Sequence, residues 1–184
     1  MPNLVRRRQL LTLGAAAGFA TFAAPAWASA LAPAAPRRAT LHNLHTGDRF
    51  DEVYYEGGRY LADALAEANQ VMRDWRTGET HDIDPALYDA LHVLGSKLDT
   101  RAPFQIISGY RSPRTNAMLN ARSKGVATKS QHMLGKAIDV RLPGVELSNL
   151  HKAALAIGAG GVGYYPSSNF VHLDTGRVRQ WRGS

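Results

Sequence analysis

The spacing of apolar residues divides the chain into helical and extended segments. Four segments place apolar side chains three and four positions apart, which predicts helices with one buried face. These segments are 61–75, 84–98, 115–122 and 147–158. Six shorter segments combine alternating polarity with β-branched and aromatic residues, which predicts strands. They are 39–44, 53–55, 104–108, 137–142, 162–165 and 170–175. This pattern predicts a single α+β domain with a mainly antiparallel sheet packed by helices.

The N-terminal segment has the composition of a secretion signal. Three arginines at 6–8 precede an uncharged, mostly apolar run over 10–28. The run ends with Ala26 and Ala28 in the spacing of an A-x-A cleavage signal. The paired arginines and the residues after them also resemble a twin-arginine export signal. The alternative is an uncleaved membrane anchor, since about 20 apolar residues can span a bilayer.

Cleavage at this signal would divide the chain into three parts. We predict a signal peptide of the twin-arginine type over 1–28, a linker over 29–38 and one folded domain over 39–184. Export would place the domain in the periplasm, with no stable membrane insertion after cleavage. The formal net charge of +7 falls to +4 when the three signal arginines are removed. Charge therefore gives little support to nucleic-acid binding, and we expect no nucleic-acid partner.

The composition of the chain excludes several kinds of functional site. It contains no cysteine, which excludes disulfides, thiolate zinc sites, iron–sulfur clusters and cysteine nucleophiles. With 45% hydrophobic and 20% charged residues, it has the composition of a globular domain. A metal site in this chain must therefore use histidine and carboxylate ligands.

Two late strands present such ligands on their polar faces. Strand alternation separates Asp139 from its apolar neighbours, and it places His172 and Asp174 together on one face of the last strand. His132 precedes Asp139 by seven positions, in a polar loop where Gly135 permits a sharp reversal. If the two strands are neighbours, His132, Asp139 and His172 converge on one point.

Two imidazoles and one carboxylate form a suitable zinc set. Three protein ligands leave the fourth tetrahedral position open for water, as in hydrolytic zinc sites. The metal in such a site lowers the pKa of its bound water to roughly 7 and polarises a carbonyl. The alternative is that His132, Asp139 and His172 are simply polar strand and loop residues.

Three motifs give the chain a family resemblance. Residues 130–139 match S-x-H-x-x-G-x-A-x-D, residues 170–176 read F-V-H-L-D-T-G, and residues 108–112 read S-G-Y-R-S. Together they resemble zinc peptidases of bacterial cell walls, a superfamily that includes D-Ala-D-Ala peptidases, lysostaphin and the hedgehog signalling domain. The G-G-V-G-Y-Y-P stretch at 160–166 resembles the periplasmic murein endopeptidases within it. The resemblance implies a hedgehog-like fold and hydrolysis of peptidoglycan cross-links, including those between two diaminopimelate residues.

The resemblance also implies roles for individual residues. His132, Asp139 and His172 would bind one zinc ion per chain. Arg111 would hold a substrate carboxylate or stabilise the oxyanion of the tetrahedral intermediate. Ser130, at the start of the first motif, would contact the substrate. The alternative for Arg111 is a loop arginine that donates to nearby carbonyls.

The general base is not assigned by the resemblance. The peptidase relatives place a glutamate three residues before the last histidine, where this chain has Asn169. Lysostaphin-like enzymes place a histidine two residues before it, where this chain has Phe170. Asp174 is a candidate because it shares a face with His172. Asp174 would either accept the proton of zinc-bound water or orient His172, and a metal hydroxide without a carboxylate base is the third possibility.

These observations predict an enzyme and leave one rival. The enzyme is a periplasmic zinc metallopeptidase whose partners are the cross-link peptides of peptidoglycan, and we expect it to be a monomer. The rival is a wall-binding module that kept the zinc site and lost catalysis. The absence of the relatives' glutamate at Asn169 keeps this rival open.

Overall fold

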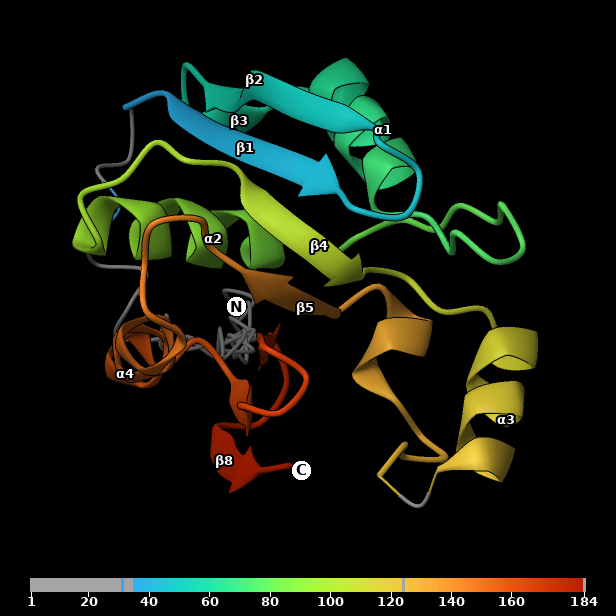
Figure 1. Ribbon diagram of the computed structural model, residues 1–184. Coiled ribbons are helices and arrows are strands. Elements are labelled where there is room, and N and C mark those ends of the chain that lie inside the picture. The colour runs from blue at the N-terminus through green and yellow to red at the C-terminus, as the bar shows by residue number, and fades with distance from the viewer. Residues whose placement is uncertain (1–30, 32–34, 124, 184) are drawn as a thin grey trace, which may run out of the picture.

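The computed structural model describes residues 31, 35–123 and 125–183; the predicted signal peptide over 1–28 lies outside this part of the chain. Eight strands form one sheet in the order β3-β2-β1-β4-β5-β7-β6-β8 (Figure 1). The strands are β1 (Arg37–Asn43), β2 (Arg49–Glu56), β3 (Arg59–Tyr60), β4 (Phe104–Ser108), β5 (Ala137–Arg141), β6 (Gly161–Tyr165), β7 (Phe170–Asp174) and β8 (Arg179–Arg182). The helices are α1 (Ala62–Val71), α2 (Pro85–Lys97), α3 (Pro113–Arg122), the short 3-10 helix η2 (Gln131–Leu134) and α4 (Leu147–Ile157). The predicted α+β class is confirmed.

The sheet is mixed, which corrects the expectation of a mainly antiparallel sheet. β1 pairs with β4 in parallel, and β6 pairs with β8 in parallel. The first pairing arises because α1 and α2 lie between β1 and β4 in the chain, as a crossover connection requires. The second involves β8, a strand that the apolar pattern did not predict.

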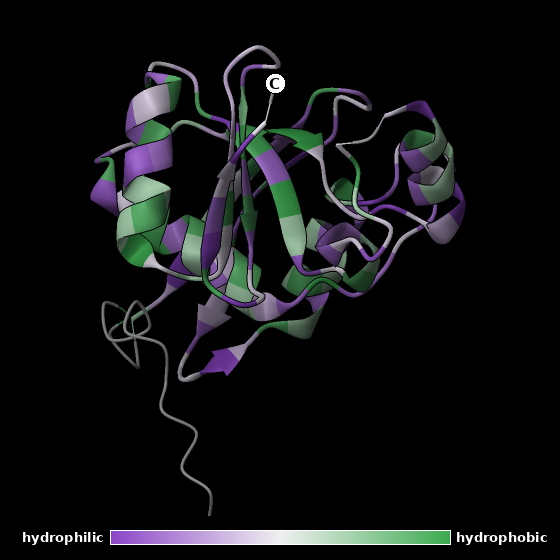
Figure 2. Ribbon diagram, turned by 90° about the horizontal axis from the view of Figure 1, so that it is seen from below, coloured by the Kyte–Doolittle hydropathy of each residue, from purple (hydrophilic) through white to green (hydrophobic). Residues whose placement is uncertain are grey.

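α2 and α4 cover the apolar face of the sheet. α2 and α4 lie side by side (Figure 1), α2 contacts β1, and α4 contacts β6 and β7. Their buried residues join those of the strands in one hydrophobic core, which includes Leu91, Ile138, Leu150 and Leu173. The helices show both purple and green residues in Figure 2, as expected for amphipathic helices on a surface. α3 lies away from α4 at the opposite side of the molecule in both views.

Local sequence signals account for most element boundaries. Asp84 caps α2 by accepting a hydrogen bond from Ala86 N at 3.0 Å, as the Asp-Pro signal indicated. α3 begins at Pro113, two residues earlier than expected, because Ser112 acts as its N-cap. α1 ends at Val71 rather than at 75, and β1 begins at Arg37, within the segment predicted to be a linker. Every helix in the described part of the chain is too short or too polar to cross a membrane.

Candidate active site

Two of the candidate ligands lie opposite each other on neighbouring strands. β5 and β7 are antiparallel, and their register pairs Asp139 with His172. Ile138 and Leu173, the alternate residues, belong to the hydrophobic core on the other face. The two strands are therefore neighbours, as predicted. The register that places Asp139 opposite His172 could not be derived from the alternation within each strand.

The third candidate ligand comes from the short helix η2. The hydroxyl of Ser130 caps this helix and accepts a hydrogen bond from His132 N at 3.3 Å. Gly135 ends the helix with a positive φ of 64°. A Cβ atom at that position would lie 2.2 Å from Asp82 O, so the close turn requires glycine. The contact that the structure gives Ser130 is thus with the helix that carries His132.

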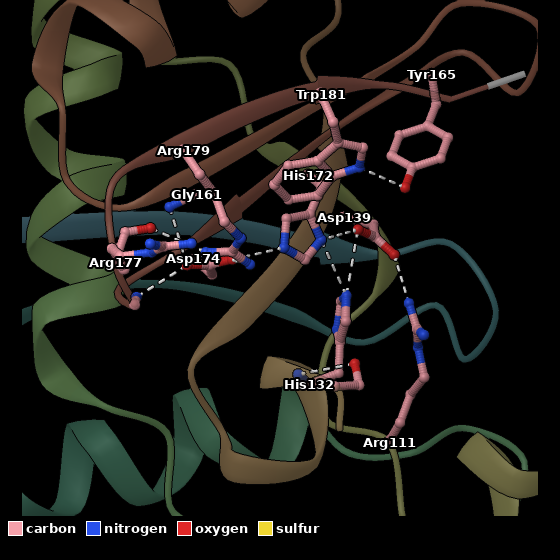
Figure 3. Close-up of polar contacts among 12 residues, drawn as sticks. Arg111, His132, Asp139, Gly161, Tyr165, His172, Asp174, Arg177, Arg179 and Trp181 are labelled. Atoms are coloured by element: carbon pink, nitrogen blue, oxygen red, sulfur yellow. Dashed lines mark hydrogen bonds and ion pairs between the residues drawn. The ribbon is translucent and has the colours of Figure 1, made fainter. Parts of the chain in front are cut away.

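The three side chains converge on one point. His132 Nε2 lies 3.2 Å from His172 Nδ1, and Asp139 Oδ1 lies 3.3 Å from His132 Nε2 and 2.8 Å from His172 Nδ1. Figure 3 shows His132 pointing toward Asp139 and His172. Tetrahedral zinc with bonds near 2.0 Å separates its ligand atoms by about 3.3 Å. The triangle of donor atoms therefore fits a zinc ion in size as well as in chemistry.

The other nitrogen of each imidazole has an acceptor. His132 Nδ1 lies 2.7 Å from the carbonyl oxygen of Gly109, and His172 Nε2 lies 3.1 Å from Asp174 Oδ2. Each acceptor favours the tautomer that carries its hydrogen on that nitrogen. The lone pairs of His132 Nε2 and His172 Nδ1 then face the centre of the triangle, which is the arrangement of metal-binding histidines.

A β-bulge brings Arg111 to this site. The β4–β5 register pairs Ile106 with Val140 but Ser108 with Asp139, so one extra residue lies in β4 at this point. The bulge turns the Ser108 side chain to the ligand face. The guanidinium of Arg111 then donates from Nε to Ser108 Oγ at 3.0 Å and from Nη2 to Asp139 Oδ2 at 2.8 Å.

A buried carboxylate supports the loop that carries Arg111. Asp74 Oδ2 accepts hydrogen bonds from Ser112 N at 3.0 Å and from Ser112 Oγ at 2.9 Å. Tyr110 N donates to Met72 O at 2.8 Å. A Cβ at Gly109 would lie 2.3 Å from Met72 O. The two backbone segments therefore approach this closely only because residue 109 is glycine.

Asp174 lies behind His172, away from the triangle. Its side chain is fully buried. Oδ1 accepts from the backbone N–H groups of Gly161 and Gly176 at 2.9 and 2.8 Å and from Arg179 Nη1 at 3.1 Å. Oδ2 contacts His172 Nε2 at 3.1 Å and Arg179 Nη2 at 2.6 Å (Figure 3). Both carboxylate oxygens are thus occupied by hydrogen-bond donors.

Arg179 and Trp181 are two residues of this network that sequence reasoning missed. Both lie on β8, which has only one apolar residue and so shows no strand pattern. The Trp181 ring lies 5.1 Å from the His172 ring, measured between centroids. The signal that indicates this approach is the pair of glycines, Gly161 and Gly163, within β6, since glycine inside a strand often marks close approach of another group.

The electrostatics of the cluster favour the ligand forms of His132 and Asp139 and oppose that of His172. Burial lowers the pKa of His132 below its ordinary value. Burial opposes ionisation of Asp139, but the charges and hydrogen bonds of His132 and His172 outweigh it and hold the Asp139 pKa well below its ordinary value. Burial is likewise outweighed at His172, where hydrogen bonds to Asp139 and Asp174 raise the pKa. Metal binding needs an ionised carboxylate and neutral imidazoles, so protonation of His172 would compete with metal binding.

Asn169 and Phe170, which stand where other members of the superfamily carry a glutamate or a histidine as general base, have structural roles here. Asn169 has a positive φ of 53° in the turn between β6 and β7, a conformation that asparagine tolerates well. Phe170 stacks on Tyr165 with ring centroids 4.4 Å apart. Neither side chain offers a carboxylate or an imidazole.

Comparisons with known proteins agree on one family. The family model of the peptidoglycan L,D-endopeptidase MepK matches residues 31–181. The peptidoglycan L,D-endopeptidase MepK of Escherichia coli K12 is 51% identical over 176 residues, which cover 95% of this chain and 96% of that protein. The probable peptidoglycan L,D-endopeptidase MepK of Haemophilus influenzae is 42% identical over 149 residues, which cover 80% of each chain.

Proposed function

The chain belongs to the MepK family of peptidoglycan L,D-endopeptidases, which are zinc peptidases, and we propose that it hydrolyses peptide cross-links of bacterial peptidoglycan. The observation that carries the proposal is the buried triangle of His132, Asp139 and His172, whose donor atoms lie 2.8 to 3.3 Å apart. The substrate bonds include the L,D bond between two diaminopimelate residues. The resemblance to murein endopeptidases, seen first in the G-G-V-G-Y-Y-P stretch at 160–166, is confirmed by the similarity over most of the chain.

In this proposal one zinc ion per chain would be held by His132 Nε2, His172 Nδ1 and Asp139 Oδ1. When bound, zinc polarises the scissile carbonyl and lowers the pKa of a water molecule to roughly 7. Two contacts support these assignments, since His132 Nδ1 and His172 Nε2 both have acceptors outside the triangle. Those acceptors would hold the two rings in the orientation that ligation requires.

The remaining site residues act on the substrate or on the ligands. Arg111 binds a substrate carboxylate or the oxyanion, because a guanidinium has five N–H groups and two of them suffice for Ser108 and Asp139. Ser130 contributes by capping the helix of His132 beside the substrate. Asp174 orients His172, since donors occupy both of its oxygens. We assign no carboxylate base, and the activation of water would then rest on the Lewis acidity that a zinc ion at this site would supply.

The proposal is tested by incubating purified cross-linked muropeptides with the protein and analysing the products by mass spectrometry. Parallel samples contain a chelator, or a chelator followed by excess zinc. We expect dimers to be converted to monomers, the chelator to block this, and zinc to restore it. The matched variants are Asp139→Asn, which should be inactive, and Asp51→Asn, which changes an exposed carboxylate on β2 and should be active.

The rival function makes a different prediction for the same samples. Intact dimers in the zinc-replete sample would contradict the catalytic proposal for these substrates. If that protein still held zinc and sedimented with isolated peptidoglycan, the wall-binding module would be favoured. The observation that keeps the rival open is the turn position of Asn169, which provides no base.

We also propose that the protein acts as a monomer in the periplasm after twin-arginine export. Support comes from the arginines at 6–8, the A-x-A signal before residue 29 and the wall substrate named for the relatives. Replacing Arg7 and Arg8 by lysine should leave an uncleaved precursor in the cytoplasm, detected by fractionation and mass spectrometry. Unchanged export would contradict the twin-arginine assignment. Light scattering of the exported protein reports its oligomeric state.

A further inference from the structure

The strand β8 lies across two glycines of β6 and reaches the back of the candidate metal site. Its parallel pairing places Arg179 beside Gly161 and Trp181 beside Gly163. A Cβ at Gly161 would lie 2.3 Å from Arg179 Nη1 and 2.5 Å from Asp174 Oδ2. A Cβ at Gly163 would lie 2.6 Å from the Trp181 ring. The absence of these two side chains is what allows β8 to contact the network around His172.

The two oxygens of Asp174 are held in different ways. Oδ1 receives backbone N–H groups from Gly161 and Gly176, which belong to the main chain and are fixed by it. Oδ2, the oxygen that contacts His172, has Arg179 Nη2 as its other partner among the described residues. Without that guanidinium the carboxylate would be anchored at one oxygen and could rotate about its χ2 bond. The oxygen that faces His172 therefore depends on Arg179.

We propose that Arg179 is a positioning residue for the candidate metal ligand His172, and that it acts through Asp174. The two-point contact of its guanidinium with both oxygens fixes the plane of the carboxylate. The fixed carboxylate accepts the hydrogen of His172 Nε2 and so keeps Nδ1 turned toward Asp139 and His132. This inference rests on the proposed zinc site.

Trp181 strengthens the same arrangement from the neighbouring position. Its ring lies under the guanidinium of Arg179, with Cζ 4.9 Å from the ring centroid. Its Nε1 donates to Tyr165 Oη at 2.8 Å, which fixes the ring (Figure 3). Arg179 is thus held by Trp181 on one side and by the carbonyl oxygen of Arg177 at 3.0 Å. A guanidinium placed in this way loses little freedom when it binds Asp174.

Two other roles for Arg179 must be distinguished from positioning. Its side chain is 35% exposed, so it could bind a substrate carboxylate directly. It could also serve only to attach β8 to the sheet. A substrate contact would raise KM and leave zinc affinity unchanged. An attachment would lower the melting temperature of the chelator-treated protein and leave the zinc affinity of the folded protein unchanged.

The experiment compares the wild-type protein with Arg179→Gln, Arg179→Lys and Arg182→Gln. Arg182 is the matched control because it is an arginine on the same strand that lies over the Tyr164 ring instead of contacting Asp174. Zinc affinity is measured by competition with a chromogenic chelator, and the melting temperature is measured in excess chelator. The kcat and KM for a cross-linked muropeptide are measured with saturating zinc.

We expect Arg179→Gln to bind zinc about 10-fold more weakly, at the lower end of the range for groups that hydrogen-bond metal-binding histidines, because Arg179 acts through Asp174. The kcat should fall while KM stays within about twofold. Arg179→Lys keeps the charge without the two-point contact and should recover part of both losses. Arg182→Gln should match the wild type in zinc affinity.

Unchanged zinc affinity in a folded Arg179→Gln protein would overturn the inference. If Arg179→Gln does not fold, Arg179→Lys is decisive by itself, and wild-type zinc affinity in that variant would overturn the inference. A wild-type protein that binds zinc but cleaves nothing would remove the proposed function and leave the zinc measurements to decide the role of Arg179. A wild-type protein that binds no zinc would overturn both.

Discussion

Two buried aspartates of this protein are surrounded by donors, and only one of them leads to the candidate site. Asp89 on α2 accepts hydrogen bonds from Arg37 at 2.8 Å, Tyr54 at 2.8 Å and Tyr60 at 2.6 Å. Asp174 on β7 also pairs with an arginine and accepts two backbone N–H groups. Both carboxylates are buried, and both pair with an arginine. Each would be costly to leave unpaired.

The difference lies in where the partners lead. The partners of Asp89 named above are two tyrosine hydroxyls and one guanidinium. None of these groups contacts His132, Asp139 or His172. Asp174 contacts an imidazole, and the other nitrogen of His172 lies 2.8 Å from Asp139. Asp89 thus stabilises the fold alone. Asp174 also affects the candidate site, because its partner His172 contacts Asp139 through the other ring nitrogen.

The largest effect is expected at the triangle itself. Asp139→Asn keeps the size of the side chain but removes the negative charge that zinc requires. The loss of several kcal/mol of transition-state stabilisation corresponds to roughly a 1,000-fold lower cleavage rate. Metal content by elemental mass spectrometry should fall in parallel, while Asp51→Asn retains both. Full zinc content in Asp139→Asn would remove this residue from the ligand set.

Replacing Asp89 or Asp174 by asparagine tests the comparison directly. Asp89→Asn leaves Arg37 without its ion-pair partner and should lower the free energy of unfolding by about 3–5 kcal/mol. The zinc affinity of the folded variant should be unchanged. Asp174→Asn should weaken zinc binding by about 10- to 100-fold. Urea unfolding measures the free energy of unfolding, and chelator competition measures zinc affinity. Equal losses of zinc affinity in Asp89→Asn and Asp174→Asn would contradict the distinction between the two aspartates.

Another buried carboxylate, Asp74, allows a pH test of a structural role. Burial would raise its pKa, but hydrogen bonds from Thr115, Ser112 and Arg76 outweigh burial and lower it. A carboxyl with a lowered folded pKa stabilises the protein above its ordinary pKa, and this stability is lost as the pH falls through the folded pKa. Asp74→Asn should therefore cost about 1–3 kcal/mol at pH 7.

The difference between wild type and Asp74→Asn should shrink below about pH 4. Urea unfolding at a series of pH values in the presence of chelator measures it without a contribution from metal binding. A difference that stays constant from pH 7 to pH 3 would contradict a stabilising role for the ionised Asp74.

The smallest effect is expected at the bulge that carries Ser108. Ser108→Ala removes the acceptor of Arg111 Nε, a hydrogen bond worth about 1 kcal/mol. The kcat/KM for muropeptide cleavage should fall about fivefold, with zinc affinity unchanged. Ser96→Ala, on the exposed side of α2, is the control and should have no effect. A zinc affinity that falls with kcat/KM would place Ser108 with the metal ligands instead.

The sequence was sufficient to place Asp139 and His172 on their strands and faces, because strand alternation is a local property. Asp139 and His172 each lie between apolar neighbours, and this pattern identified both their strands and their faces. The strand pairing that joins them, and the bulge that turns Ser108, depend on contacts between distant segments. No local pattern contains that information, so the mixed sheet and the position of Arg111 relative to Asp139 required the structure.

The contacts of Asp174 were harder to predict than those of the ligands. Arg179 follows it by five residues but reaches it only after β8 pairs in parallel with β6. A segment of two arginines, one glutamine and one tryptophan has no strand pattern, because its stability comes from lying over Gly161 and Gly163. Sequence reasoning therefore left the role of Asp174 open between base and orienting group.

The position of β5 and β7 within the sheet bears on how readily the site can open. Each of these strands has a partner on both sides, so their backbone amides exchange with solvent only when several strands open together. The loop of Arg111 is also tied to other segments, because Tyr110 N donates to Met72 O and Ser112 N donates to Asp74. Local opening of the strands that carry Asp139 and His172 therefore costs a large share of the free energy of unfolding.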